Sequence, residues 1–331
     1  MHDCFDTSIQ FNIKSLMSLS SQEFRNYKLA CTACPVLVFQ SASRIPPSPS
    51  TMSSTNFTTP PPPANENILI SFPKPSILLV TLNRPNDLNS MNTPMHHYLH
   101  ALFAWFDNEP SLLCGIMTGK GRAFCAGADL KEWNSSHENG PPKDASQGRS
   151  MPSSGFGGVS KRGGKKPIIC AVNGICVGGG CELIINADIV IADAKAVFGL
   201  PEVKIGVAAL AGALTRVVRT VGRQRAMEMA LTGRTLSAEE AREWGLVNRV
   251  VNGGVVDEAM KMADLICANS PDSVIVSREG VKLGWEGVGA EEGTRLLAEN
   301  WYSRIDGGEN MKEGVKSFVE KRKPKWVPSK L

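Results

Sequence analysis

The chain has 331 residues, of which 42% are hydrophobic and 21% are charged, a composition that is ordinary for a globular protein. The net charge of +4 is small and much of the positive excess lies in residues 321–330, so no nucleic acid partner is predicted. The longest apolar stretch, residues 168–192, is interrupted by Glu182 and Asp188 and lacks the run of about 18 apolar residues that a membrane-spanning helix needs.

Residues 1–63 are rich in Ser, Thr and Pro, end in a run of four prolines and show no helical or strand periodicity. We expect them to form a disordered N-terminal extension. A cleaved presequence is an alternative, although the segment carries acidic residues and has no basic amphipathic helix. Translation that begins at Met52 is another.

The folded part is expected to begin near Asn67 and to alternate strands with helices. Thr93 is expected to cap a helix that has Pro94 at its first position, and a second helix is expected to open at Gly180. The predicted strands are residues 77–83, 112–118, 168–172, 189–192 and 247–251. From about residue 209 onward the pattern is mostly helical. This order indicates an α/β fold with a helical C-terminal part.

Residues 134–165 are rich in Gly, Ser and Pro and offer little apolar surface to bury. We expect this segment to be mobile in the absence of a ligand.

Cysteine and histidine spacing gives no metal site. The nine cysteines have no framework spacing and are interpreted as reduced, mostly buried thiols. The pair Cys31 and Cys34 has no second pair and is interpreted as chance. His96, His97 and His100 share one predicted helix without an adjacent carboxylate, and they are interpreted as helix-surface residues.

Two glycine-containing turns are the strongest functional signal. Residues 124–129 (Phe-Cys-Ala-Gly-Ala-Asp) follow a strand, and residues 173–182 (Asn-Gly-Ile-Cys-Val-Gly-Gly-Gly-Cys-Glu) join a strand to a helix. Glycine lets backbone amides approach a ligand closely, and two amides that converge on one oxygen make an oxyanion hole. Neither turn matches a phosphate-binding fingerprint.

Two acidic residues lie in apolar surroundings near these turns. Glu182 opens an apolar helix, and Glu202 follows the sequence Phe-Gly-Leu-Pro at residues 198–201. A carboxylate in such a setting is costly unless it has a partner or a chemical task. Together with the two turns, the pair is interpreted as functional rather than as two structural acids.

With these motifs, the chain from about Asn67 to Lys323 resembles the enoyl-CoA hydratase/isomerase (crotonase) family. The matching stretches occur in the family's order: residues 81–85, 118–119, 122–131, 166–174, 178–182, 187–188, 198–202, 206, 231–233 and 245–247. The resemblance implies a spiral of ββα turns over residues 64–256 and a helical region over residues 257–323 that builds trimers or hexamers.

The resemblance also implies roles for individual residues. The oxyanion amides fall on Ala128 and Gly179, and the acid–base pair of true hydratases falls on Glu182 and Glu202. The residues that contact coenzyme A would be Ala126, Ala128, Asp129, Leu130 and Lys131. Residues 134–165 would help to cover the acyl end. The only coenzyme expected is the coenzyme A of the acyl-CoA substrate itself, with no further cofactor.

Because both acids are present, the resemblance favours an enoyl-CoA hydratase, in fatty-acid oxidation or in more specialised acyl-CoA metabolism. A Δ3,Δ2-enoyl-CoA isomerase and a non-catalytic, RNA-binding homologue are the alternatives. One departure from the family bears on the substrate. Ala209 stands where proline is usual and Leu210 where a water-placing glycine is expected, so the preferred acyl chain stays open.

The chain ends in Ser329-Lys330-Leu331, which is the tripeptide that the peroxisomal import receptor reads. The preceding residues 324–328 are expected to leave this tail, residues 324–331, extended and accessible. The peroxisome is therefore the predicted location, and a mitochondrion is the alternative.

Overall fold

The structure is a computed structural model that describes residues 57–138 and 151–331, without the side chains of residues 136–138. Most of the expected N-terminal extension, the pair Cys31 and Cys34, and residues 139–150 of the polar segment lie outside the described residues.

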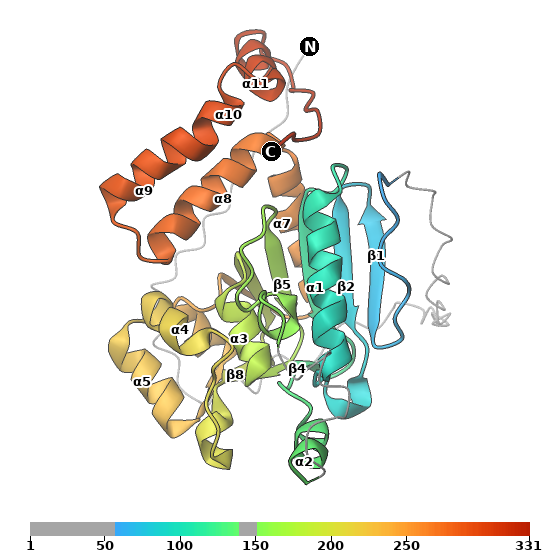
Figure 1. The fold of residues 1–331 in the computed structure, drawn as a ribbon, viewed down its shortest axis with the longest axis vertical. Helices are drawn as coiled ribbons and strands as arrows, with labels where there is room; N and C mark the ends of the chain where they lie inside the picture. Colours follow the sequence, from blue (N-terminus) through green and yellow to red (C-terminus); the bar gives the residue numbers. More distant parts are fainter. Residues whose placement is uncertain (1–56, 139–150) are drawn as a thin grey trace, which may run out of the picture. The chain divides into compact units, whose positions relative to one another are not determined.

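The larger of two sheets has six strands in the order β1-β2-β3-β5-β7-β10 (Figure 1). Its strands are β1 (Ile68–Lys74), β2 (Ile77–Leu82), β3 (Cys114–Gly119), β5 (Ile168–Val172), β7 (Ile189–Asp193) and β10 (Arg249–Val251). Only the β1–β2 pair is antiparallel. Parallel strands are buried on both faces, which explains their continuous apolar sequences.

The smaller sheet has the order β4-β6-β8-β9. Its strands are β4 (Ala123–Cys125), β6 (Ile175–Val177), β8 (Val197–Gly199) and β9 (Thr235–Ser237). Strands β4, β6 and β8 are parallel, and each follows closely on a strand of the larger sheet. Two successive strands therefore enter different sheets before the chain turns into a helix.

The helices complete the architecture. They are α1 (Thr93–Asn108), α2 (Leu130–Glu138), α3 (Gly179–Ile185), α4 (Ala213–Val221), α5 (Arg223–Thr232), α6 (Ala238–Glu243), α7 (Val255–Cys267), α8 (Pro271–Trp285), α9 (Ala290–Leu297), α10 (Ser303–Ile305) and α11 (Glu309–Val319). Short helical turns are η3 (Pro85–Asp87), η5 (Phe156–Gly158), η6 (Pro201–Ile205) and a π turn, η7 (Ala298–Tyr302). Among the described residues, no helix is both long and apolar enough to cross a membrane.

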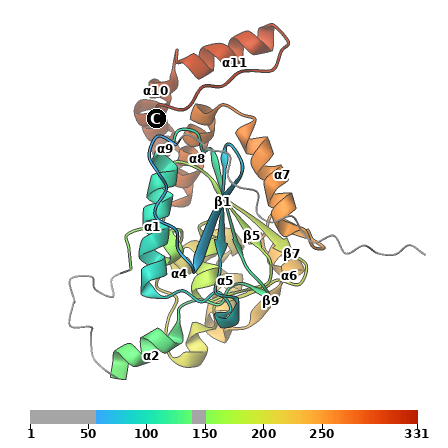
Figure 2. The same cartoon turned by 90° about the vertical axis from the view of Figure 1, so that its right-hand side faces the viewer.

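Helices α1 and α7 cover opposite faces of the larger sheet (Figure 2). Alternate residues of one strand serve the two faces, because strand side chains have a period of two. Cys170 and Val172 pack on the α1 side, whereas Ile169 and Ala171 pack with Ala259 of α7. The α/β fold with a helical C-terminal region is the one expected.

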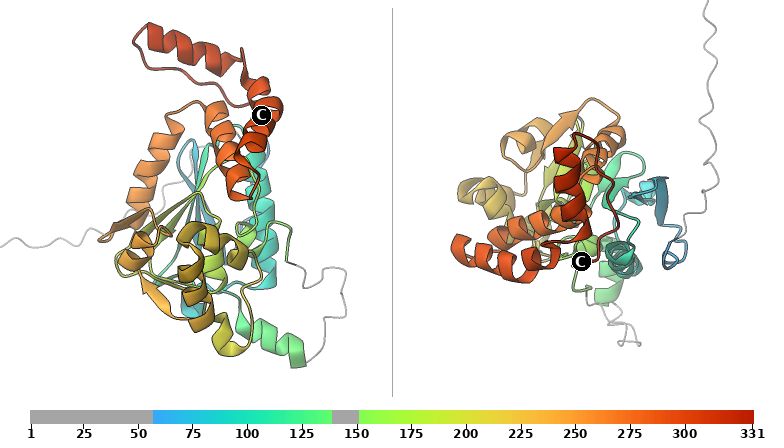
Figure 3. Two further views of the ribbon diagram at one scale, coloured as in Figure 1. Left: turned by 90° about the vertical axis from the view of Figure 1, so that its left-hand side faces the viewer. Right: turned by 90° about the horizontal axis from the view of Figure 1, so that it is seen from above.

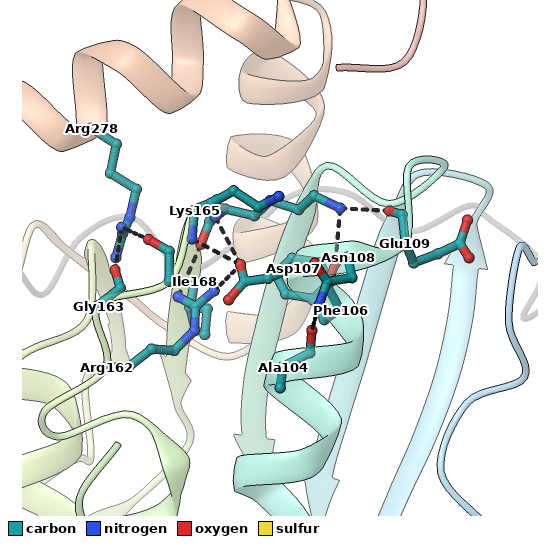
Figure 4. Close-up of polar contacts among 12 residues, drawn as sticks. Ala104, Phe106, Asp107, Asn108, Glu109, Arg162, Gly163, Lys165, Ile168 and Arg278 are labelled. Atoms are coloured by element: carbon teal, nitrogen blue, oxygen red, sulfur yellow. Dashed lines mark hydrogen bonds and ion pairs between the residues drawn. The ribbon is translucent and has the colours of Figure 1, made fainter. Parts of the chain in front are cut away.

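The C-terminal helices α8 to α11 lie together (Figure 3). Helix α8 is joined to the core by Arg278, whose Nε lies 2.7 Å from Asp188 Oδ1 and whose Nη1 donates to the carbonyls of Gly163 and Gly164. Next to it, Asp107 Oδ1 accepts from the Lys165 and Lys166 amides, each at 3.0 Å (Figure 4). These bonds fix the loop that precedes β5.

Two expected boundaries are wrong. The disordered extension does not reach residue 63, because the Phe57 ring packs 4.6 Å from that of Phe72 and 5.3 Å from that of Trp105. The expectation that residues 134–165 have little surface to bury also fails in part, since residues 156–160 are buried. In both places one aromatic side chain supplies apolar surface that the surrounding composition conceals.

Smaller differences concern single residues. The cap of α1 is Asn92 rather than Thr93, and its Oδ1 accepts from the Met95 amide at 3.3 Å. Cys114, Cys170 and Cys176 are buried thiols, as expected.

Candidate active site

The two glycine turns meet beside one cavity. The first turn follows β4 and is held by a short parallel bridge in which the Met91 amide donates to the Gly127 carbonyl and the Asp129 amide to the Met91 carbonyl, both at 2.9 Å. The second turn, at Gly178, opens α3. A Cβ atom on Gly127 would lie only 3.2 Å from the Gly179 nitrogen.

Glycine is required at this junction for two physical reasons. Gly127 and Gly178 have φ angles of +98° and +56°, which side-chain-bearing residues rarely adopt. A Cβ on Gly180 would lie 2.2 Å from the Cys125 carbonyl oxygen, so no larger residue fits against β4. The motif therefore allows the close approach that brings Ala128 and Gly179 to one cavity.

Glu182 lies in the first turn of α3 with only 5% of its surface exposed. Its Oε2 accepts a hydrogen bond of 3.1 Å from the Ala213 amide, the first residue of α4. Burial raises the pKa of Glu182 to about 7; the Ala213 amide opposes this rise and Glu202 adds to it. Near neutral pH the carboxyl group can accordingly either accept or give up a proton.

Glu202 reaches the same cavity from η6. Its Oε1 lies beside Gly178, where a Cβ would be 3.5 Å away. Its Oε2 is buried and has no hydrogen-bond partner within residues 57–138 and 151–331. Burial raises the pKa of this carboxyl group as well. An unpartnered, buried carboxylate oxygen is costly in a fold and is typical of a functional site.

The cavity has a volume of about 410 Å³. Its lining includes the expected Ala126, Ala128, Leu130, Gly179, Glu182 and Glu202. It also includes Leu210, the departure from the family pattern, whose side chain is 75% exposed. The predicted acid–base and oxyanion residues are therefore brought together. In the part of the chain that the structure describes, no group of three or more His, Cys, Asp or Glu is placed to hold a metal ion.

Asp129 and Lys131, which were expected to contact coenzyme A, do not line this cavity. Asp129 pairs with Arg84 at 2.9 Å, and its carboxylate also accepts from the Lys131 amide, in the first turn of α2, at 3.1 Å. Lys131 is 86% exposed and lies 3.1 Å from Asp87. Asp129 thus has a structural partner, whereas Lys131 is a solvent-exposed cation next to Leu130, which lines the cavity.

The interpretation of His96 as a helix-surface residue is wrong. His96 is 7% exposed, lines the cavity and accepts a hydrogen bond at Nδ1 from the Gly157 amide at 3.1 Å. Its ring stands edge-on to Phe156, with 4.5 Å between centroids. The sequence contained a signal, because position 96 lies three residues before Leu99 and seven before Phe103, on the apolar face of α1.

Phe156 was missed because it lies in a Gly- and Ser-rich segment. A Cβ on Gly179 would lie 2.4 Å from its ring, so Phe156 forms a wall beside the Gly179 amide. Ser160 fixes this wall: its Oγ accepts from the Phe156 amide at 2.7 Å and donates to the Ala211 carbonyl at 2.6 Å.

A parallel-strand spiral with two glycine turns and a buried carboxylate pair defines a crotonase-like acyl-CoA site. The family description "Enoyl-CoA hydratase/isomerase" matches residues 73–328, and the chain belongs to that family.

Among its relatives, the mevalonyl-coenzyme A hydratase of Beauveria bassiana is 57% identical over 274 residues, which cover 82% of this chain and 98% of that protein. The mevalonyl-coenzyme A hydratase of Aspergillus fumigatus is 49% identical over 81% of this chain and 98% of its own. A probable mitochondrial enoyl-CoA hydratase of Dictyostelium discoideum is 39% identical over 75% of this chain and 86% of that protein. The crystal structure of enoyl-CoA hydratase from Mycobacterium tuberculosis H37Rv superposes with a TM-score of 0.71 at 32% identity, over 80% of this chain and all of that one.

Proposed function

We propose that this enzyme catalyses the reversible addition of water to a branched, hydroxylated 2-enoyl-CoA, with mevalonyl-CoA as the hydrated partner. The observation that carries the proposal is the meeting of Glu182, Glu202 and both glycine turns at one cavity. The two mevalonyl-coenzyme A hydratases among the relatives support this substrate over a straight acyl chain.

In the proposed mechanism, the Ala128 and Gly179 amides donate to the thioester carbonyl oxygen. Negative charge builds on that oxygen as water adds at C3, and each fixed donor stabilises it by about 3 kcal/mol. Glu182 activates the water, and Glu202 exchanges the proton at C2. Because the two carboxyl groups interact, their titrations belong to the pair and the roles can be shared.

Coenzyme A would lie along the turn that contains Ala126, Ala128, Asp129, Leu130 and Lys131, as the family resemblance implies. The position of Asp129 supports an indirect part, since its ion pair with Arg84 stabilises the turn. Lys131 and the amides of the turn would then contact the coenzyme directly. The same mechanism needs no metal or redox cofactor.

The test is turnover by the purified enzyme. Mevalonyl-CoA should lose water to give a 3-methyl-5-hydroxypent-2-enoyl thioester, detected by mass spectrometry, and the product should be rehydrated. Unbranched 2-enoyl-CoAs of several lengths and a 3-enoyl-CoA serve as comparisons. Faster double-bond migration in the 3-enoyl-CoA than dehydration of mevalonyl-CoA would instead identify an isomerase.

The region after residue 257 is proposed to build trimers or hexamers. Large apolar side chains stand exposed there, with Val281 76%, Phe318 85% and Val319 74% exposed. Large exposed apolar side chains of this kind support an interface in this region. A monomeric mass by sedimentation at micromolar concentration would contradict the proposal.

A peroxisomal location is proposed from Ser329-Lys330-Leu331. In the structure this tail is not free, contrary to expectation: Lys165 Nζ donates to the Leu331 carbonyl at 2.7 Å, and Lys330 lies 2.6 Å from Glu309. Surface contacts of this kind contribute about 1 kcal/mol or less each, so a receptor can displace them. The mitochondrial relative supports the alternative. An N-terminal fluorescent fusion should give peroxisomal puncta that disappear when residues 329–331 are removed.

A further inference from the structure

The cavity contains a hydrogen-bond donor that the proposed mechanism does not use. His96 accepts from the Gly157 amide through Nδ1, and that bond requires an unprotonated Nδ1. In a neutral imidazole the proton then lies on Nε2, which becomes a donor. No described residue of the chain accepts a hydrogen bond from this Nε2–H.

The neutral state of His96 follows from its surroundings. Burial, with a smaller contribution from neighbouring His97, lowers the pKa of His96 to about 4. The ring is thus uncharged at neutral pH, and the Gly157 bond selects one tautomer. The position and orientation of the His96 ring are also fixed, because the ring packs edge-on against Phe156.

Phe156 also relates His96 to the reacting atoms. A Cβ on Gly179 would lie 2.4 Å from the Phe156 ring, whose centroid is 4.5 Å from that of the His96 ring. His96 and Gly179 therefore neighbour the same aromatic ring and line the same cavity. A substrate group a few bonds beyond the thioester carbonyl can reach it.

The other polar residues of the lining are less suited to this task. Glu132 accepts from the Thr93 amide at 2.9 Å, and Lys161 and His97 are exposed and solvated. At a solvated side chain, a ligand group only replaces a water molecule and adds little binding free energy. A buried donor, in contrast, discriminates strongly against a ligand that leaves it without a hydrogen bond.

We propose that His96 Nε2–H donates a hydrogen bond to the terminal C5 hydroxyl of the acyl group and so selects hydroxylated over purely aliphatic thioesters. This inference rests on the proposed hydratase function. The C5 hydroxyl oxygen of a mevalonyl thioester lies three bonds beyond C3, on the side away from the coenzyme, and can accept from a neutral imidazole.

Two substitutions separate the two ring nitrogens. In His96→Asn the side-chain oxygen takes the place of Nδ1, so the bond from Gly157 is kept and the Nε2 donor is lost. In His96→Gln the amide nitrogen takes the place of Nε2, so a donor is restored there. His100→Asn is the matched control, since His100 is on the same helix, contacts Ser154 Oγ at 2.8 Å and does not line the cavity.

The assay compares kcat/KM for dehydration of mevalonyl-CoA and of 3-hydroxy-3-methylpentanoyl-CoA, which lacks only the C5 oxygen. The wild type should prefer mevalonyl-CoA by about 10-fold or more, which is the contribution of one hydrogen bond between neutral groups. His96→Asn should lose this preference because its kcat/KM falls for mevalonyl-CoA alone. His96→Gln should retain part of the preference, and His100→Asn should keep all of it.

Equal losses on both substrates in His96→Asn, or an unchanged preference, would overturn the inference and leave the hydratase function intact. Equal kcat/KM of the wild type for the two thioesters would also overturn the inference, and this measurement does not depend on the folding of His96→Asn. A wild type that turns over neither thioester defeats the proposed function itself.

Discussion

Replacement of Glu182 by Gln should reduce activity and, at alkaline pH, stabilise the fold. Gln has nearly the same volume and can still accept the Ala213 amide bond that Glu182 Oε2 accepts at 3.1 Å. It cannot take a proton from water. General acid–base groups contribute about 100-fold to 10,000-fold, so kcat should fall by that factor while coenzyme A binding is nearly unchanged.

The stability effect follows from the raised pKa of Glu182. Burial moves it from 4.5 to about 7. Between these values the folded state holds a proton that the unfolded chain has released, so folding stability falls by about 1.4 kcal/mol per pH unit as pH rises. The wild type therefore loses about 3 kcal/mol from pH 4.5 to pH 8 through this group. Gln has no such dependence.

Chemical denaturation of both proteins at pH 4.5 and pH 8 measures this difference. The gap in free energy of unfolding between Glu182→Gln and wild type should shift by about 3 kcal/mol in favour of the variant at pH 8. Glu243→Gln, at the exposed end of α6, is the control and should show no such shift. Parallel pH dependences in wild type and Glu182→Gln would refute the buried, partly protonated state, and near-normal hydration by the variant would refute its catalytic role.

Three further outcomes are expected. Glu202→Gln should lower kcat by about 100-fold with coenzyme A binding retained, and a smaller effect on kcat than on KM would contradict its role in proton transfer. Gly127→Ala should lower kcat by about 10-fold to 100-fold, because its Cβ would press on the Gly179 nitrogen at 3.2 Å; Gly253→Ala has a similar φ of +80° with open space around it and should leave kcat unchanged. Arg278→Met should destabilise the fold by about 1–3 kcal/mol in denaturant titrations, since it leaves Asp188 Oδ1 and two carbonyls without the arginine donor. Arg295→Met, which breaks only pairs that are about half exposed, should change stability by less than about 1 kcal/mol.

Much of the site could be predicted because its signals are local. Gly127 and Gly178 are dictated by positive φ angles, and Gly179 and Gly180 by close contacts with the Phe156 ring and the Cys125 carbonyl. Glu182 and Glu202 stand out as acids in apolar sequence. The long, continuous apolar runs of β2, β3, β5 and β7 likewise identify strands that are buried on both faces.

Short elements left no such trace. Strands β4, β6, β8 and β9 have three residues each, too few for a period of two to be visible, so the smaller sheet was not predicted. The sheet that they form spans the chain from β4 to β9. It depends on the route of the chain rather than on local preference.

The sequence by itself determined the family, the helical C-terminal part, the two glycine turns and the identity of the two acids, because each depends on conformational limits or hydrophobic periodicity within a few residues. Only the tertiary structure decided that His96 lines the cavity with an Nε2–H that no described residue accepts, that Phe156 forms its wall, and that the last residue contacts Lys165. The His96–Gly157 and Lys165–Leu331 contacts join residues 61 and 166 positions apart. Whether a polar group is buried, and which partner it finds, is set by chain segments that no local pattern brings together.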